Sequence, residues 1–193
     1  MSSNNVDCTN NNSINQIFEL PGLKNLILNG NPEISFNLNF LSSINYAESS
    51  VLEILLLRNT KLLSLNGIEN LPNLKSLDVS ENRLTSKWIK FIYLYFQLLT
   101  SCYIIGIPLS IYQLKSLERL YLDQNEITGS LSSEIASLMS LKSIDVFDNQ
   151  LTGSLPSQMM QLSNLEDAEF GRNQFTGSAQ QIADIFAVSL TIL

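Results

Sequence analysis

The sequence predicts an α/β solenoid, with a parallel β-sheet on its concave face and short helical or 3₁₀ segments on its convex side. Three segments, which start at Leu117, Leu141 and Leu165, align without gaps at a spacing of 24 residues. Counted from the first residue of each copy, apolar residues stand at offsets 0, 3, 5 and 10, and an Asn stands at offset 8. A fixed period of this length is typical of repeat architectures, in which stacked units bury one continuous core.

Each part of a copy has a physical reason. Offsets 3 to 5 alternate inward and outward, as a short half-buried strand requires. The Asn comes where the chain turns off the strand, and its amide can bond to backbone groups inside the turn. A Thr-Gly pair recurs at offsets 11 and 12, and glycine permits a turn with positive φ. The second half predicts a short helical segment, with Ile135 and Leu138, then Met159 and Leu162, as core contacts.

Earlier copies start at Leu23, Leu52 and Leu74. The Leu74 copy matches at every offset, whereas the Leu52 copy carries Thr60 in the Asn position. Leu190 matches the start of one further copy. We count about seven copies, one of them degenerate.

Composition and charge narrow the classes of function. The chain has 193 residues, 45% of them apolar and 15% charged, which is typical of a globular domain with a core. Its net charge of −7 argues against nucleic acid or an anionic membrane as a partner, because both need a basic surface. Without histidine the chain cannot form Ser–His or Cys–His nucleophile pairs, and it lacks the commonest ligand of catalytic zinc. We expect no enzyme activity, no cofactor and no metal site.

The repeat pattern resembles that of plant-type leucine-rich-repeat proteins. Leu141 to Pro156 matches the pattern L-x-x-L-x-L-x-x-N-x-L-T-G-x-[IL]-P nearly throughout, and the resemblance covers most of the chain from about residue 14. Val6 to Ile17 is similar to the end of the N-terminal cap of such ectodomains, with Cys8 at the last cap cysteine, although the upstream cysteine and the cap Trp are missing. The alternative for Cys8 is a free thiol. We expect a partial cap over 1–22 and a leucine-rich-repeat domain over 23–193.

The resemblance implies a function and a location. It implies a fragment of a receptor-like or secreted protein, acting in recognition outside the cell or at its surface, with no catalysis in the repeats. Met1 to Asn12 has no apolar segment of the kind found in signal peptides, so the chain itself carries no export signal.

The segment between Leu74 and Leu117 breaks the period. These two starts lie 43 residues apart, which is one 24-residue copy and 19 residues more. An irregular apolar segment, 87–106, stands between a normal first half and a normal second half. Four interpretations remain open. The segment is a degenerate repeat with Phe96 and Leu98 in the strand, or it is translated intron sequence, since codons for Ser86, Lys87 and Trp88 can contain a splice-donor string. Otherwise it is a helix looped out from the solenoid, or a membrane span over 88–112, whose only charge is Lys90.

The outward offsets of the strands predict the binding surface. They form an acidic strip with two aromatic residues, Tyr121 and Phe147, and aromatic residues among polar groups suit a protein or peptide interface. We expect a basic or polar partner; the alternative is a solvated face that binds nothing. The candidate residues are Asp78, Glu81, Tyr121, Asp123, Gln124, Asp145, Phe147, Asp148, Glu169 and Arg172.

Other functions compete with recognition outside the cell. An intracellular repeat scaffold for protein assembly fits the missing signal peptide. A truncated gene product without a function of its own fits a chain that starts inside a cap and ends inside a repeat. An enzyme is disfavoured, because carboxylate pairs such as Asp145 and Asp148 would lie on an open surface with no pocket to shift their pKa values. Membrane association would come from a part of the gene outside this chain, or from 88–112.

Overall fold

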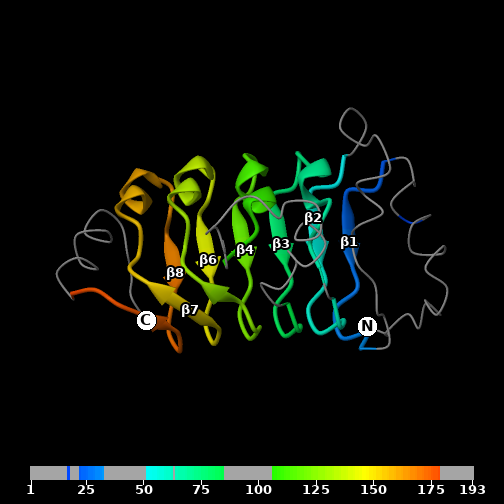
Figure 1. Cartoon of the computed structure of the whole chain (residues 1–193). Helices are drawn as coiled ribbons and strands as arrows, with labels where there is room; N and C mark the ends of the chain where they lie inside the picture. The colour runs from blue at the N-terminus through cyan, green and yellow to red at the C-terminus, as the bar shows by residue number, and fades with distance from the viewer. Residues whose placement is uncertain (1–16, 18–21, 33–50, 63, 85–105, 179–193) are drawn as a thin grey trace, which may run out of the picture.

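The chain folds as a stack of short coils, each of which adds one strand to the same parallel sheet. A computed structural model describes residues 17, 22–32, 51–62, 64–84 and 106–178. Figure 1 shows the strands of the main sheet side by side in chain order, from blue β1 to orange β8. The six strands are β1 (Asn25–Ile27), β2 (Ile54–Leu56), β3 (Ser76–Asp78), β4 (Arg119–Tyr121), β6 (Ser143–Asp145) and β8 (Asp167–Glu169).

The register of the sheet follows the repeat offsets. Offset 3 of each copy pairs with offset 3 of the next, as Leu55 does with Leu77 and Leu120 does with Ile144. These side chains are buried and line one contiguous core. Burying one such side chain stabilises a fold by about 1.5–3 kcal/mol. The apolar positions of the repeat therefore place every coil on its neighbour.

A second sheet and a set of 3₁₀ helices form the other sides of the coils. A second parallel sheet contains β5 (Thr128–Gly129), β7 (Gln150–Gly153) and β9 (Gln174–Phe175), and it includes the Thr-Gly pairs at 128–129 and 152–153. The opposite side of the coils holds the 3₁₀ helices η3 (Ile68–Asn70), η5 (Leu109–Gln113), η6 (Ser133–Ser137) and η7 (Ser157–Gln161). The predicted helical core contacts are confirmed, since Ile135, Leu138, Met159 and Leu162 are all buried.

A ladder of asparagines holds the turns together. The Asn82 Nδ2 donates to the Leu57 carbonyl of the preceding coil (2.8 Å) and to the Val79 carbonyl of its own coil (2.9 Å). Its Oδ1 accepts the backbone N–H of Leu62 at 2.8 Å. Asn125, Asn149 and Asn173 repeat this pattern, each bonding backbone groups of two successive coils. The role predicted for offset 8 is confirmed.

The residue just before the ladder Asn adopts a left-handed backbone. Only glycine takes this conformation without strain, and for other residues it costs energy that the surrounding structure must offset. The repeat nevertheless keeps polar residues there in most copies, because the tight turn off the strand needs a positive φ. The positions and φ values are Gly30 (71°), Asn59 (53°), Glu81 (52°), Gln124 (53°), Asp148 (54°) and Arg172 (47°).

The period of the sequence is broken between strands β3 and β4. Strand β3 pairs directly with β4, with Leu77 opposite Leu120, so no further strand stands between them. The sheet therefore has no place between β3 and β4 for the strand that the degenerate-repeat interpretation assigns to Phe96 and Leu98, which themselves lie outside the described residues. Arithmetic on the period could not separate an extra short copy from an insertion.

The coil resumes in register at Gly106. A side chain at Gly106 would lie 2.7 Å from the backbone oxygen of Ser130, the residue at the same offset one coil later. Helix η5 follows in the stack of 3₁₀ helices between η3 and η6. Residues 85–105 and most of the predicted cap over 1–22 lie outside the described residues. Among those described, no helix has the length and hydropathy to cross a bilayer.

Candidate functional site

The exposed side of the six-stranded sheet gathers most of the residues predicted to bind a partner. We call this side the concave face and define it by the outward side chains at offsets 4, 6 and 7 of each coil. Asp78, Tyr121, Asp145 and Glu169 occupy offset 4 on neighbouring strands and are paired in register. Asp123 and Phe147 occupy offset 6. Offset 7 carries Glu81, Gln124, Asp148 and Arg172, in the left-handed turns at the ends of the strands.

Three of the carboxylates are oriented by their own strands. One oxygen of Asp78 accepts the N–H of Ser80 at 3.0 Å. Asp145 accepts the N–H of Phe147 at 2.9 Å in the same way, and Glu169 accepts that of Gly171 at 2.8 Å. The repeat therefore sets these side chains at corresponding positions along the sheet.

The carboxylates are crowded together. Asp123 is almost fully buried, and this burial raises its pKa above the ordinary value, with the nearby Asp78 adding to the rise. Burial also raises the pKa of Asp145, and the charges of Asp123, Glu169 and Asp78 raise it further. A cation placed among these groups would relieve both the desolvation and the repulsion.

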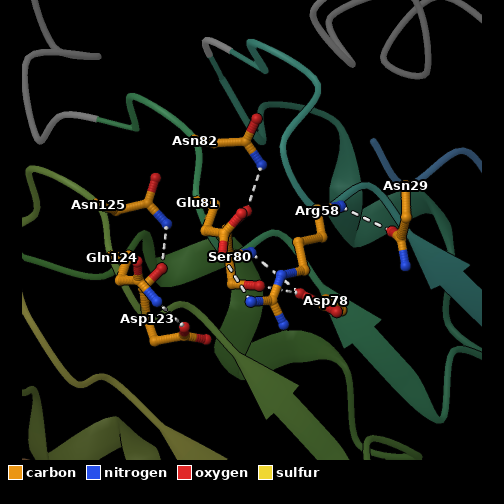
Figure 2. Close-up of polar contacts among 9 residues, drawn as sticks. All are labelled: Asn29, Arg58, Asp78, Ser80, Glu81, Asn82, Asp123, Gln124 and Asn125. Carbon is orange, nitrogen blue, oxygen red and sulfur yellow. Dashed lines mark hydrogen bonds and ion pairs between the residues drawn. The ribbon is translucent and has the colours of Figure 1, made fainter. Parts of the chain in front are cut away.

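An arginine that the sequence analysis did not single out enters this cluster. Arg58 donates from its guanidinium to Glu81 of the next coil, as Figure 2 shows. The bond to Glu81 raises the pKa of Arg58, and the charges of Asp123 and Asp78 contribute. Arg58 stands at offset 6 of the Leu52 copy, so the repeat register itself could have identified it.

At the other end of the face, Arg172 covers the ring of Phe147. The guanidinium carbon lies 5.2 Å from the ring centroid, within the range of a cation–π interaction. Phe147 also lies close to Gly171 of the next coil, where an added Cβ would come within 3.0 Å of the ring. Two predicted residues are thus in mutual contact rather than separately presented to solvent.

The first two strands carry apolar side chains on the same face. Ile27 in β1 is 60% exposed and stands in register with the half-buried Leu56 in β2. Ile54, two residues before Leu56, is also half-buried. Sequence reasoning missed these residues because it considered only the acidic offsets of the later copies.

A row of opposite charges flanks the concave face at offset 1. Glu53 pairs with Lys24 at 3.2 Å on one side and with Lys75 at 2.8 Å on the other, and these lysines lower its pKa. Lys142 pairs with Glu118 at 2.8 Å in the same row. Because this row alternates in sign, its charges compensate each other. The excess negative charge of the face comes from offsets 4, 6 and 7.

The described residues contain no group of three or more His, Cys, Asp or Glu side chains arranged to hold a metal ion. The carboxylates of the face lie along an open sheet surface. Their arrangement suits electrostatic contact with a cationic group of a partner.

Comparison with known proteins agrees with the repeat pattern. The model of the Leucine Rich Repeat family matches residues 73–94, 116–138 and 140–162. A comparison with curated proteins gives no match. A leucine-rich-repeat protein of Leptospira interrogans is similar in structure, with 25% identity and a TM-score of 0.67 over 92% of this chain and 39% of its own.

Two plant receptors are also similar. The plant peptide hormone receptor RGFR1, solved in complex with RGF2, shows 27% identity and a TM-score of 0.58 over 75% of this chain. The leucine-rich-repeat ectodomain of the Arabidopsis receptor kinase HAESA, solved with an N-terminally extended IDA peptide hormone, shows 26% identity and a TM-score of 0.58 over 76% of this chain. The match covers 21% of the first receptor chain and 22% of the second.

Proposed function

We propose that this chain, with its leucine-rich-repeat fold, is a non-catalytic recognition module whose concave face binds a protein or peptide of basic or polar character. One observation carries this proposal: the carboxylates of Asp123 and Asp145 stand beside Asp78 on one side of the sheet, where burial first and the neighbouring negative charges second raise the pKa values of Asp123 and Asp145. A bound cation lowers that cost. Open sheet faces with oriented polar groups and aromatic residues suit protein interfaces.

The plant neighbours support the class of partner. Both are described as complexes with peptide ligands, RGF2 and an extended IDA peptide. The likeness to an ectodomain supports a receptor-like role outside the cell or at its surface. The chain spans about a fifth of either receptor, so it would represent one part of such a protein.

Charge reversal on the face tests the proposal. A display library of random linear peptides is selected on the full chain, and the affinity of the enriched peptides is measured by fluorescence anisotropy. The variant carrying Asp145→Lys and Asp148→Lys should bind them at least about tenfold more weakly, since reversing a charge in a contact costs about 1.4 kcal/mol or more.

The control variant carries the same change of charge on the opposite side of the coils. Glu69 lies in η3 and Glu134 in η6, so Glu69→Lys with Glu134→Lys should leave the affinity unchanged. Equal affinity of the wild type and the Asp145/Asp148 variant, with both proteins folded by circular dichroism, would refute binding at the concave face.

A further inference from the structure

The central row of the concave face changes character along the solenoid. The offset-4 side chains stand opposite one another through all six strands, so they form one continuous row across the sheet. The first two are apolar and the next four are acidic or aromatic. In chain order the row is Ile27, Leu56, Asp78, Tyr121, Asp145 and Glu169.

The apolar end is a small surface of three neighbouring side chains. Ile27 is the most exposed, at 60%, and Leu56 is paired with it in register. Ile54 in β2 stands beside Asn25 of β1, on the same side of the sheet. Single exposed apolar residues are ordinary on protein surfaces, but an exposed Ile27 beside the half-buried Ile54 and Leu56 is a place where an apolar side chain of a partner gains from burial.

The acidic and aromatic part of the row, around Tyr121, suits a cationic group. Tyr121 stands between Asp78 and Asp145 in the row, and Asp123 follows two residues later in the same coil, just past the end of β4. A guanidinium or ammonium group over the ring would gain both the cation–π attraction and contact with carboxylates on either side. Arg58 does not fill this position, since its guanidinium donates to Glu81.

The distance between the two ends sets the spacing of a ligand. Neighbouring strands lie about 4.8 Å apart, so Tyr121 is about 10 Å from Leu56 and about 14 Å from Ile27 along the row. An extended peptide rises about 3.3 Å per residue, so its residues i and i+4 are separated by about 13 Å. Residues i and i+4 of an extended chain also point to the same face.

We propose that the concave face binds one extended peptide, laid across the strands, with an apolar side chain on Ile27 and Leu56 and a Lys or Arg four positions away over Tyr121. This inference rests on the proposed function and adds to it the composition and spacing of the ligand. The Tyr121 ring and the flanking carboxylates of Asp78 and Asp145 would recognise the cation.

Defined peptides test the spacing. One nine-residue peptide carries Leu and Arg four positions apart in a Gly-Ser background, and a second of the same composition carries them three positions apart, on opposite faces. Binding to the isotopically labelled full chain is followed by NMR titration. We expect the first peptide to bind at least about fivefold more tightly, because the second can place only one of the two side chains, each worth about 1 kcal/mol or more.

Substitutions on both sides assign the two ends. Replacing Arg by Gln in the peptide should reduce its affinity for the wild type but change its affinity for the Tyr121→Ala variant little. Replacing Leu by Ser in the peptide should likewise reduce its affinity for the wild type but change its affinity for the Ile27→Ser variant little. The peptide changes need no altered protein, so they remain informative if a variant fails to fold. Equal affinity of the two spacings would overturn this inference.

The outcomes separate the two proposals. Library peptides that lose affinity for the Asp145/Asp148 variant but show no apolar and basic pair four positions apart would support binding at the face and refute the spacing. Library peptides that bind this variant as well as the wild type would refute both.

Discussion

The asparagine ladder makes a quantitative prediction for Asn82→Ala. The Asn82 Oδ1 accepts the backbone N–H groups of Thr60 (3.1 Å) and Leu62 (2.8 Å), both on fully buried residues. No other acceptor is recorded for these two groups in the described structure, whereas the carbonyl of Leu57 keeps the Thr60 hydroxyl as a donor. The carbonyl of Val79 keeps the amide of Asn125. The substitution therefore leaves two buried N–H groups without a partner.

The cost follows from those two groups. An unsatisfied buried donor costs about 1–3 kcal/mol, so we expect Asn82→Ala to lower the free energy of unfolding by about 2–5 kcal/mol. For a chain of this size, that corresponds to a fall in Tm of about 5–15 °C. The measurement is urea unfolding followed by circular dichroism, supported by thermal melts.

Asn164→Ala is the matched control. Its amide donates to the Met139 carbonyl at 2.8 Å, but the contact is exposed, so water can replace it. We expect a loss below about 1 kcal/mol. If Asn82→Ala costs no more than Asn164→Ala, the ladder does not stabilise the turns in the way inferred from its hydrogen bonds.

Three further predictions concern the insertion and the acidic face. Deleting residues 87–105 should leave cooperative unfolding intact, with stability changed by no more than about 1 kcal/mol, because the coil resumes in register at Gly106 and loop length has a weak effect; a molten or insoluble product would contradict this. Gly106→Ala should lower stability by about 1–3 kcal/mol in urea unfolding, because its Cβ would lie 2.7 Å from the Ser130 oxygen, whereas Ser154→Ala at the same offset should be neutral. Burial raises the pKa of Asp145, so its ionised form opposes folding above that pKa. Asp145→Asn should accordingly raise Tm or leave it unchanged at pH 7, and it should not raise Tm below about pH 3.9. A Tm that falls at pH 7 but not at low pH would contradict this, because it would show that the folded protein stabilises the charge of Asp145.

The period of the sequence predicted most of the fold. Offsets 3 and 5 fix the inward side chains, and the position of the Asn at offset 8, where the chain turns off the strand, predicts its bonds to the backbone. Even Thr60, which replaces the Asn in one copy, fits the pattern, since its hydroxyl donates to the Leu57 carbonyl and Asn82 of the next coil binds its N–H.

The remainder depends on contacts that a period does not encode. The 43-residue interval allowed either an extra short copy or an insertion, and the period could not show that β3 pairs directly with β4. The left-handed turns at Glu81, Gln124 and Arg172 were not predicted, because these residue types do not favour positive φ on their own. On the concave face, the position of the Arg58 guanidinium in the acidic cluster depends on its contact with Glu81 of the next coil.

The alternating row at offset 1 restricts how this solenoid can grow or shrink. Lys24, Glu53, Lys75, Glu118 and Lys142 stand on successive coils, so every coil meets opposite charges on both sides. Removing one coil would bring like charges together, as when Glu53 meets Glu118, whereas removing two restores an attractive pair. Each exposed pair contributes at most about 1 kcal/mol to stability, but all the pairs in the row depend on the same alternation of charge from coil to coil. Recombination or design with these repeats should therefore tolerate the exchange of coils in pairs better than singly.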